Sequence, residues 1–91
     1  MNLISEIQEA AKRISPYIHK TPLLYSAHLS NMCNGKVYLK LESEQYTGSF
    51  KARGAMNKVL WLAEKGINNG VITASTGNHG MGVARALSIL K

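Results

Sequence analysis

The sequence has few cysteines, few aromatic residues and no long apolar run, and these shortages exclude several classes of protein. Its 91 residues include one cysteine, Cys33, which cannot form an internal disulfide and agrees with a reducing compartment. No apolar run is long enough to span a bilayer, so no membrane partner is predicted. The N-terminal residues are amphipathic and carry Glu6 and Glu9, unlike a secretory signal. Together these features predict a cytoplasmic protein.

Charge is unbalanced, with 11 lysines and arginines against 5 acidic residues and a formal net charge of +6 at pH 7. The basic residues are scattered singly and only 7% of residues are aromatic, so a nucleic-acid partner is not expected. The positive balance suits an anionic cofactor or substrate instead. His19 and His28 lack metal-ligand spacing, so no metal site is predicted. A 45% hydrophobic and 18% charged composition is typical of one small globular domain.

The first half of the chain predicts a helix followed by a strand. Apolar residues recur at gaps of four, three and four on one helical face: Leu3, Ile7, Ala10 and Ile14. Ser15–Pro16 should end this helix, and residues 21–25 should be extended. Asn34–Gly35 predicts a turn. Residues 36–42 then alternate polar and apolar, which predicts a half-buried strand with one apolar face: Val37, Leu39 and Leu41.

The second half predicts a helix, a short strand and a last helix. The first helix should run from Ser49 to about Lys65, with Gly66 just past its end and a buried face of Ala52, Ala55, Met56, Val59 and Ala63. Gly54 costs this helix about 1 kcal/mol, which indicates a close approach of backbone or ligand. Residues 71–74 read as a buried strand before a helix marked by Val83, Ala84, Leu87 and Leu90. The order helix, strand, helix, strand, helix predicts an α/β fold.

The stretch Thr47–Ala55 puts a lysine where a purely structural lysine is poorly suited. Ser49 is the expected N-cap, because its hydroxyl can accept a backbone N–H that the helix start leaves free. Lys51 then lies near the positive end of the helix dipole, where an ammonium group is disfavoured by about 0.3–1 kcal/mol. Partial burial there would also favour the neutral amine, the form that attacks an aldehyde. The chemistry predicted for Lys51 is therefore a Schiff base.

A second candidate site is the turn Ser75–Gly80, which is rich in glycine and small hydroxyls. Free N–H groups at such a helix start can bind a carboxylate or phosphate; Asn78 adds an amide and His79 a titratable ring. Alternatively, the hydroxyls only cap the turn, and the residues leave both possibilities open. The spacing fits neither the nucleotide P-loop nor the dinucleotide fingerprint. Combined with Lys51, the turn makes sense as the anion-binding side of a cofactor site.

These two motifs, in this order and spacing, resemble the fold-type II pyridoxal-phosphate enzymes, in particular the threonine dehydratase and serine racemase branch. The resemblance covers most of the chain and includes Thr21–Leu23. It implies a partial three-layer α/β/α fold of the tryptophan synthase β-like superfamily. It also implies that residues 1–91 are the N-terminal portion of a longer homo-oligomeric enzyme. Residues 1–48 would contribute to its larger cofactor domain, and residues 49–91 would start its smaller domain.

The resemblance also implies roles for individual residues. Lys51 would carry pyridoxal 5'-phosphate as a Schiff base and then move the α-proton of a small amino-acid substrate. Phe50 would pack beside the cofactor ring, and Asn78 would bond its 3′-oxygen. The loop that grips the substrate carboxylate would consist of Ser75, Thr76, Asn78 and His79. Family members also have a glycine-rich phosphate loop and a small polar residue at the pyridine nitrogen. This chain lacks both, so by itself it is expected to be incomplete and inactive.

The implied reaction is β-elimination from a hydroxy amino acid, giving a 2-oxo acid and ammonia, as in L-threonine/L-serine ammonia-lyases. Serine racemases carry a serine where this chain has Thr76, and that serine protonates the opposite face of the α-carbon. Threonine is bulkier and less suited to this step, so the resemblance favours elimination over racemisation. Cysteine synthases, which carry out β-replacement, usually have threonine where this chain has His79, so His79 argues against that reaction. A non-catalytic remnant or interaction module that keeps the motifs without using them is the remaining alternative.

Overall fold

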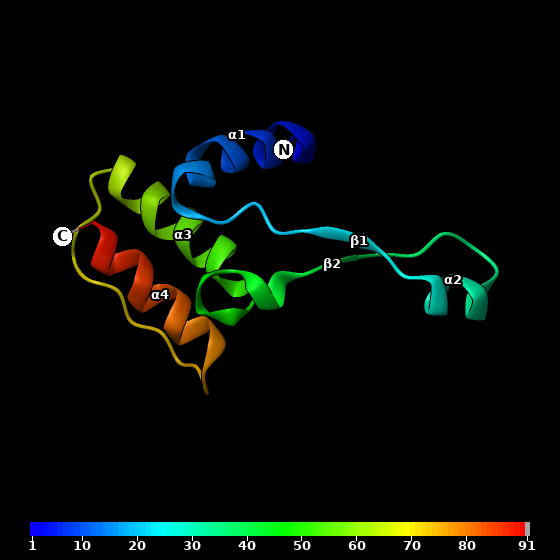
Figure 1. Ribbon diagram of the computed structural model, residues 1–91. Coiled ribbons are helices and arrows are strands. Elements are labelled where there is room, and N and C mark those ends of the chain that lie inside the picture. The colour runs from blue at the N-terminus through cyan, green and yellow to red at the C-terminus, as the bar shows by residue number, and fades with distance from the viewer. Residues whose placement is uncertain (91) are drawn as a thin grey trace.

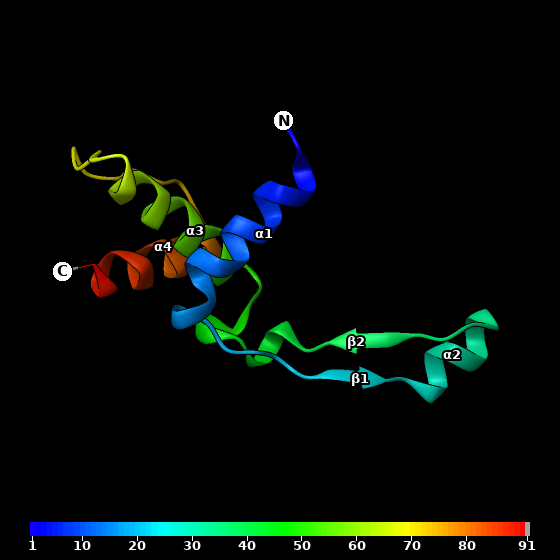
Figure 2. The ribbon, with the colours of Figure 1, turned by 90° about the horizontal axis from the view of Figure 1, so that it is seen from above.

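The computed structural model describes residues 1–90, which form a helical body and a projecting arm (Figure 1). The body consists of α1 (Leu3–Ile14), α3 (Lys51–Glu64) and α4 (Asn78–Ile89). The arm consists of β1 (Leu23–Tyr25), α2 (Ala27–Cys33) and β2 (Tyr38–Lys40). Single 3₁₀ turns complete the chain at Ser15–Tyr17, Glu42–Glu44 and Tyr46–Gly48. A view from above shows the arm extending away from all three helices of the body (Figure 2).

The arm makes the molecule elongated and leaves apolar side chains exposed. The radius of gyration is 15.8 Å, whereas a compact chain of this length would have about 12 Å. β1 and β2 pair antiparallel with Leu24 opposite Leu39 and Tyr25 opposite Tyr38. Every residue of both strands is exposed. The described chain therefore provides no layer that covers either face of this two-stranded sheet.

The hydrophobic core lies where α3 packs against α4 and the end of α1. Its buried members are Ile14, Met56, Val59, Leu60 and Ala86. The partly buried Tyr17 and Ile18 pack against this cluster from the turn after α1. The N-terminal part of α1 contributes little, since Leu3 and Ile7 are more than half exposed. Within residues 1–90, no helix combines the length and apolarity needed to cross a bilayer.

Capping residues fix the helix ends largely as predicted. α1 begins after Asn2, whose side chain accepts two backbone N–H groups, and it ends at Ser15 before the proline. Gly66 follows α3 with φ +72°, a left-handed conformation that glycine adopts without strain. Its N–H donates to the carbonyl of Ala63, and the next N–H donates to Leu62, the two bonds of a Schellman motif.

The predicted α/β order is only partly correct, because the structure is a mixed α/β arrangement of four helices and one antiparallel pair. Residues 71–74 form no strand and are exposed, so that prediction is wrong for this structure. A β-branched run becomes a strand only when a neighbour accepts its backbone hydrogen bonds, and the described chain offers none. The expected strand 36–42 shortens to Tyr38–Lys40 and is exposed rather than half-buried. The extended segment 21–25 contains β1, and α2 was not predicted.

Three details of the predicted helix 49–65 also need correction. α3 begins at Lys51 with Phe50 in the N-cap position, although Ser49 Oγ still accepts the N–H of Lys51 at 3.3 Å. Ala63 is exposed, and Leu60 takes its place on the buried face. No described atom would lie within 4 Å of a Cβ at Gly54, so the close approach of backbone predicted there does not occur, and the approach of a ligand stays a prediction.

Candidate functional site

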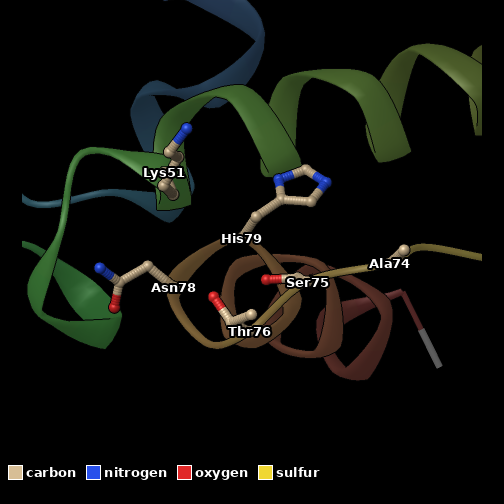
Figure 3. A pocket seen from close by; sticks show the side chains of 6 residues that line it. All are labelled: Lys51, Ala74, Ser75, Thr76, Asn78 and His79. Carbon is tan, nitrogen blue, oxygen red and sulfur yellow. The ribbon is translucent and has the colours of Figure 1, made fainter.

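Lys51 and the turn before α4 line one open cavity of about 690 Å³ (Figure 3). Lys51 is the first residue of α3, whereas Asn78 and His79 are the first two residues of α4. The other lining residues, Ala74, Ser75 and Thr76, belong to the segment that leads into α4. The fold therefore joins the two motifs that the sequence separates.

The parallel packing of α3 and α4 explains why the motifs meet. Both helices run in the same direction in both views, so their N-terminal ends lie at the same end of the body (Figures 1 and 2). Residues 65–77 return the chain along the helices to make this possible. Each helix N-terminus carries about half a positive charge, and both face the cavity region. The arrangement favours an anionic group there.

The Lys51 side chain is exposed, so the partial burial expected for it is absent. Its Nζ lies 5.0 Å from the centroid of the Phe50 ring. The two ion pairs found in residues 1–90 are Arg13–Glu64 and Arg53–Glu42, and neither involves Lys51. Phe50 does not line the cavity and is 60% exposed. The amine therefore has no carboxylate partner in the described chain and is accessible to an electrophile.

Ser75 caps the turn that leads into α4. Its Oγ accepts the N–H of Gly77 at 3.1 Å and the N–H of Gly80 at 3.0 Å. These two bonds agree with the alternative in which the hydroxyls of this segment cap the turn. The backbone N–H groups of Asn78 and His79, by contrast, have no acceptor among the described residues. These two groups give the cavity its anion-binding capacity.

An ion pair ties the base of the arm to α3. Arg53 Nε and Nη2 donate to the two carboxylate oxygens of Glu42, each at 2.8 Å, and the Thr21 hydroxyl donates to the same carboxylate. The Arg53 hydrogen bonds lower the pKa of Glu42 to about 2, with burial opposing and Thr21 assisting. The hydrogen bonds to Glu42 and its negative charge raise the pKa of Arg53, with burial opposing. Since Arg53 is two residues from Lys51, this pair fixes the first turn of α3.

Sequence reasoning missed the residues that hold the two helix starts together. A Cβ at Gly82 would lie 3.2 Å from the carbonyl oxygen of Lys51. The Arg85 guanidinium lies 3.7 Å from the centroid of the Tyr46 ring, and Tyr46 belongs to the turn that precedes Lys51. Glycine inside a helix is costly and therefore marks a possible close approach. This signal points to Gly82 as well as to Gly54. Nothing local in the sequence indicates the Arg85–Tyr46 contact.

No three side chains among histidine, cysteine, aspartate and glutamate gather as metal ligands anywhere in residues 1–90. His79 lines the cavity with its ring directed toward α3 (Figure 3). His19 instead stacks on Tyr46, with 3.8 Å between the ring centroids.

Comparison with known proteins gives one matching family, described as pyridoxal-phosphate dependent enzyme, over residues 14–91. The catabolic L-threonine dehydratase TdcB of Staphylococcus aureus is 49% identical over 96% of this chain and 25% of its own length. An L-threonine ammonia-lyase of Thermotoga maritima is 46% identical over 98% of this chain and 22% of its own length. The crystal structure of serine racemase from Dictyostelium discoideum matches with a TM-score of 0.86 and 43% identity, covering 94% of this chain and 28% of that one.

The chain therefore spans about a quarter of the length of the relatives that it matches. At these identities the match concerns sequence as well as fold. Both candidate motifs fall inside the matched range 14–91.

Proposed function

Because the chain belongs to the family of pyridoxal-phosphate dependent enzymes, we propose that it supplies the cofactor-binding lysine and part of the substrate site of an ammonia-lyase. The substrate is a hydroxy amino acid of the L-threonine or L-serine type, and the products are a 2-oxo acid and ammonia. The similarity to an L-threonine dehydratase and an L-threonine ammonia-lyase supports this reaction. The observation that carries the proposal is that one cavity is lined both by Lys51 and by Ser75, Thr76, Asn78 and His79.

The residues at this cavity suit an aldehyde cofactor. Lys51 offers a primary amine without a carboxylate partner in the described chain. The Phe50 ring lies 5.0 Å from that amine, although Phe50 itself does not line the cavity. Asn78 contributes an amide that can donate to or accept from a ring oxygen. In the proposed reaction, bound pyridoxal phosphate supplies an electron sink for negative charge at the substrate α-carbon.

The chain's own residues then position the substrate and move its proton. The free N–H groups of Asn78 and His79 bind the substrate carboxylate at the positive end of α4. Ser75 holds those N–H groups in place through its bonds to Gly77 and Gly80. Lys51 Nζ accepts the α-proton. The β-hydroxyl then leaves, and together with the α-proton it makes one molecule of water. Hydrolysis of the resulting enamine consumes one water and releases ammonia and the 2-oxo acid.

The remaining groups that the reaction needs lie outside these 91 residues in this proposal. Residues 1–48 contribute to the larger domain and residues 49–91 start the smaller one. The coverage of about a quarter of each relative supports the view that the chain is part of a longer enzyme. Sequencing the coding region past Lys91 tests this view, because a glycine-rich phosphate loop is expected downstream.

The assignment of Lys51 is tested by mixing the full-length enzyme with pyridoxal phosphate and recording the absorbance band of the lysine-bound cofactor. The band is expected to disappear in Lys51→Ala and to persist in Lys58→Ala, a matched change on the same helix. A band that survives in Lys51→Ala contradicts the assignment. A full-length protein that melts cooperatively and never captures the cofactor would instead be a non-catalytic module.

Serine racemisation is the second candidate function, since the structure superposes on a serine racemase with a TM-score of 0.86. Racemisation needs a second proton donor on the opposite face of the α-carbon. Thr76 is the hydroxyl residue of the cavity that makes no hydrogen bond to another described residue. Product analysis with L-serine and the full-length enzyme separates the candidates: pyruvate supports the lyase, D-serine the racemase, and a β-substituted product a replacement enzyme.

A further inference from the structure

α3 and α4 come into unusually close contact at Gly82. A Cβ on this buried glycine would lie 3.1 Å from Ala55 Cβ and 3.2 Å from the Lys51 carbonyl oxygen. Non-bonded carbon atoms normally sit about 3.5–4.0 Å apart, so any side chain at this position would separate the helices. The contacted carbonyl belongs to the lysine that lines the cavity.

The contact links the two sides of the cavity through one rigid element. Gly82 lies one turn after Asn78 on α4, so the first turn of this helix moves with it. On the other side, Gly82 abuts the backbone of Lys51 at the start of α3. The separation of the helices at Gly82 therefore sets the distance from Lys51 to the N–H groups of Asn78 and His79.

A second contact lies on the same face of α4, three residues after Gly82. The Arg85 guanidinium is 3.7 Å from the centroid of the Tyr46 ring, and the His19 ring is 3.8 Å from it. Two groups this close to one centroid must occupy opposite faces of the ring. Tyr46 is thus held between the N-terminal segment and α4, and it belongs to the turn that leads into Lys51.

The turn held in this way has a conformation that its residues do not favour by themselves. Thr47 has φ +63°, a left-handed value that is rare for a β-branched residue. Such a conformation persists only when surrounding contacts impose it. The stacking of Arg85 and His19 on the neighbouring Tyr46 provides such contacts.

We propose that Gly82 and the Arg85–Tyr46 stack are positioning residues that set the spacing between Lys51 and the carboxylate-binding N–H groups of α4. This inference rests on the proposed function and adds the residues that adjust its geometry. Other helical glycines differ, since a Cβ at Gly54 would meet nothing within 4 Å. At Gly80 the nearest atom would be Ser75 Cβ at an ordinary 3.4 Å.

The test uses the full-length enzyme, pyridoxal phosphate as the probe, and borohydride to fix the cofactor to any lysine that holds it. Peptide mass spectrometry then gives the labelling ratio of Lys51 to Lys58, which lies on the same helix outside the cavity. Gly82→Ala is expected to lower this ratio about tenfold, because displacements below 1 Å at a reacting group carry losses of this order. Gly54→Ala is expected to leave the ratio unchanged.

Matched changes at Tyr46 keep the proposal testable if Gly82→Ala fails to fold. Tyr46→Phe keeps both stacked faces and should retain the wild-type ratio, whereas Tyr46→Leu should lose it. Global destabilisation alone would alter the labelling of both lysines together. An unchanged ratio in folded Gly82→Ala or in Tyr46→Leu means that these residues only pack, and it overturns the proposal.

A cofactor-free measurement separates failure of this inference from failure of the proposed function. Acetate is titrated into the chain while the NMR amide signals of Asn78 and His79 are followed. Gly82→Ala should weaken acetate binding as much as Lys51→Ala does, whereas Gly54→Ala should not. If wild-type Lys51 is not labelled in preference to Lys58, the cofactor assignment fails, and the acetate result alone then decides the positioning role. Equal acetate binding in wild type and Gly82→Ala overturns it.

Discussion

Arg53 contacts both carboxylate oxygens of Glu42, with Nε to Oε2 and Nη2 to Oε1 each at 2.8 Å. This two-point geometry is the strong form of an arginine–carboxylate pair. The pair is also shielded, since the exposed fractions of the two side chains are 32% for Arg53 and 17% for Glu42. It connects the residue just after β2 to the first turn of α3, and so the arm to the lysine.

The first prediction concerns the pH dependence of this pair. The pKa of Glu42 is lowered from 4.5 to about 2 in the folded chain. A lowered folded pKa means that the stabilisation is fully present above the unfolded value and is lost as pH falls from about 4.5 to about 2. Thermal unfolding by circular dichroism should show Glu42→Gln less stable by about 1–2 kcal/mol at pH 7. The difference from wild type should vanish near pH 2.

Glu64→Gln is the matched control for this prediction. Glu64 pairs with Arg13 at 3.1 Å, but its side chain is 54% exposed, and an exposed pair contributes little. Its unfolding temperature should follow wild type across the same pH range. A Glu42→Gln difference that stays constant down to pH 2 would show that the pair does not titrate as described.

Helix ends and buried faces could be predicted because their signals are local. The proline after Ser15 and the glycine at position 66 act through their own backbone conformations, and both helices end there. The proximity of Lys51 to Ser75–His79 was expected from the chemistry of the two motifs, and the shared cavity confirms it. Their catalytic roles remain predictions.

The β structure could not be predicted because it depends on partners elsewhere in space. Residues 71–74 have strand-forming side chains, yet no described strand pairs with them. Leu24 and Leu39 pair across the arm although nothing in either segment specifies the other. The contact of Gly82 with the Lys51 carbonyl has a similar origin: the glycine is visible in the sequence, but the partner that it meets is fixed only when α3 and α4 pack.

A second prediction uses two glycines that differ only in backbone conformation. Gly66 has φ +72° and Gly54 is helical, and a Cβ at either would meet nothing within 4 Å. Gly66→Ala should destabilise the chain by about 1–2 kcal/mol, because an L side chain is strained at positive φ. Gly54→Ala should stabilise it by about 1 kcal/mol through helix propensity. Thermal unfolding measures both, and shifts of the same sign would contradict the assigned conformations.

The third prediction tests the cap before α4. Ser75→Ala removes the acceptor of two N–H groups and should cost about 1 kcal/mol, or roughly 4–8 °C in unfolding temperature. Ser75→Thr keeps the hydroxyl and should restore most of this loss. Ser88→Ala serves as the control, since this exposed hydroxyl only donates to the Arg85 carbonyl at the other end of α4. Equal stability of Ser75→Ala and wild type would remove the capping role.

The fourth prediction concerns the arm, whose apolar strand residues are exposed on both faces. Leu24 is 52% exposed and Leu39, its partner across the pair, is 41% exposed. An uncovered apolar pair on a sheet with free edges favours association with other chains. Sedimentation velocity should therefore show concentration-dependent association of the wild-type chain that Leu24→Lys reduces. Ile72→Lys, which changes a fully exposed residue away from the arm, should leave association unchanged. If both substitutions act alike, general surface hydrophobicity rather than the arm drives association.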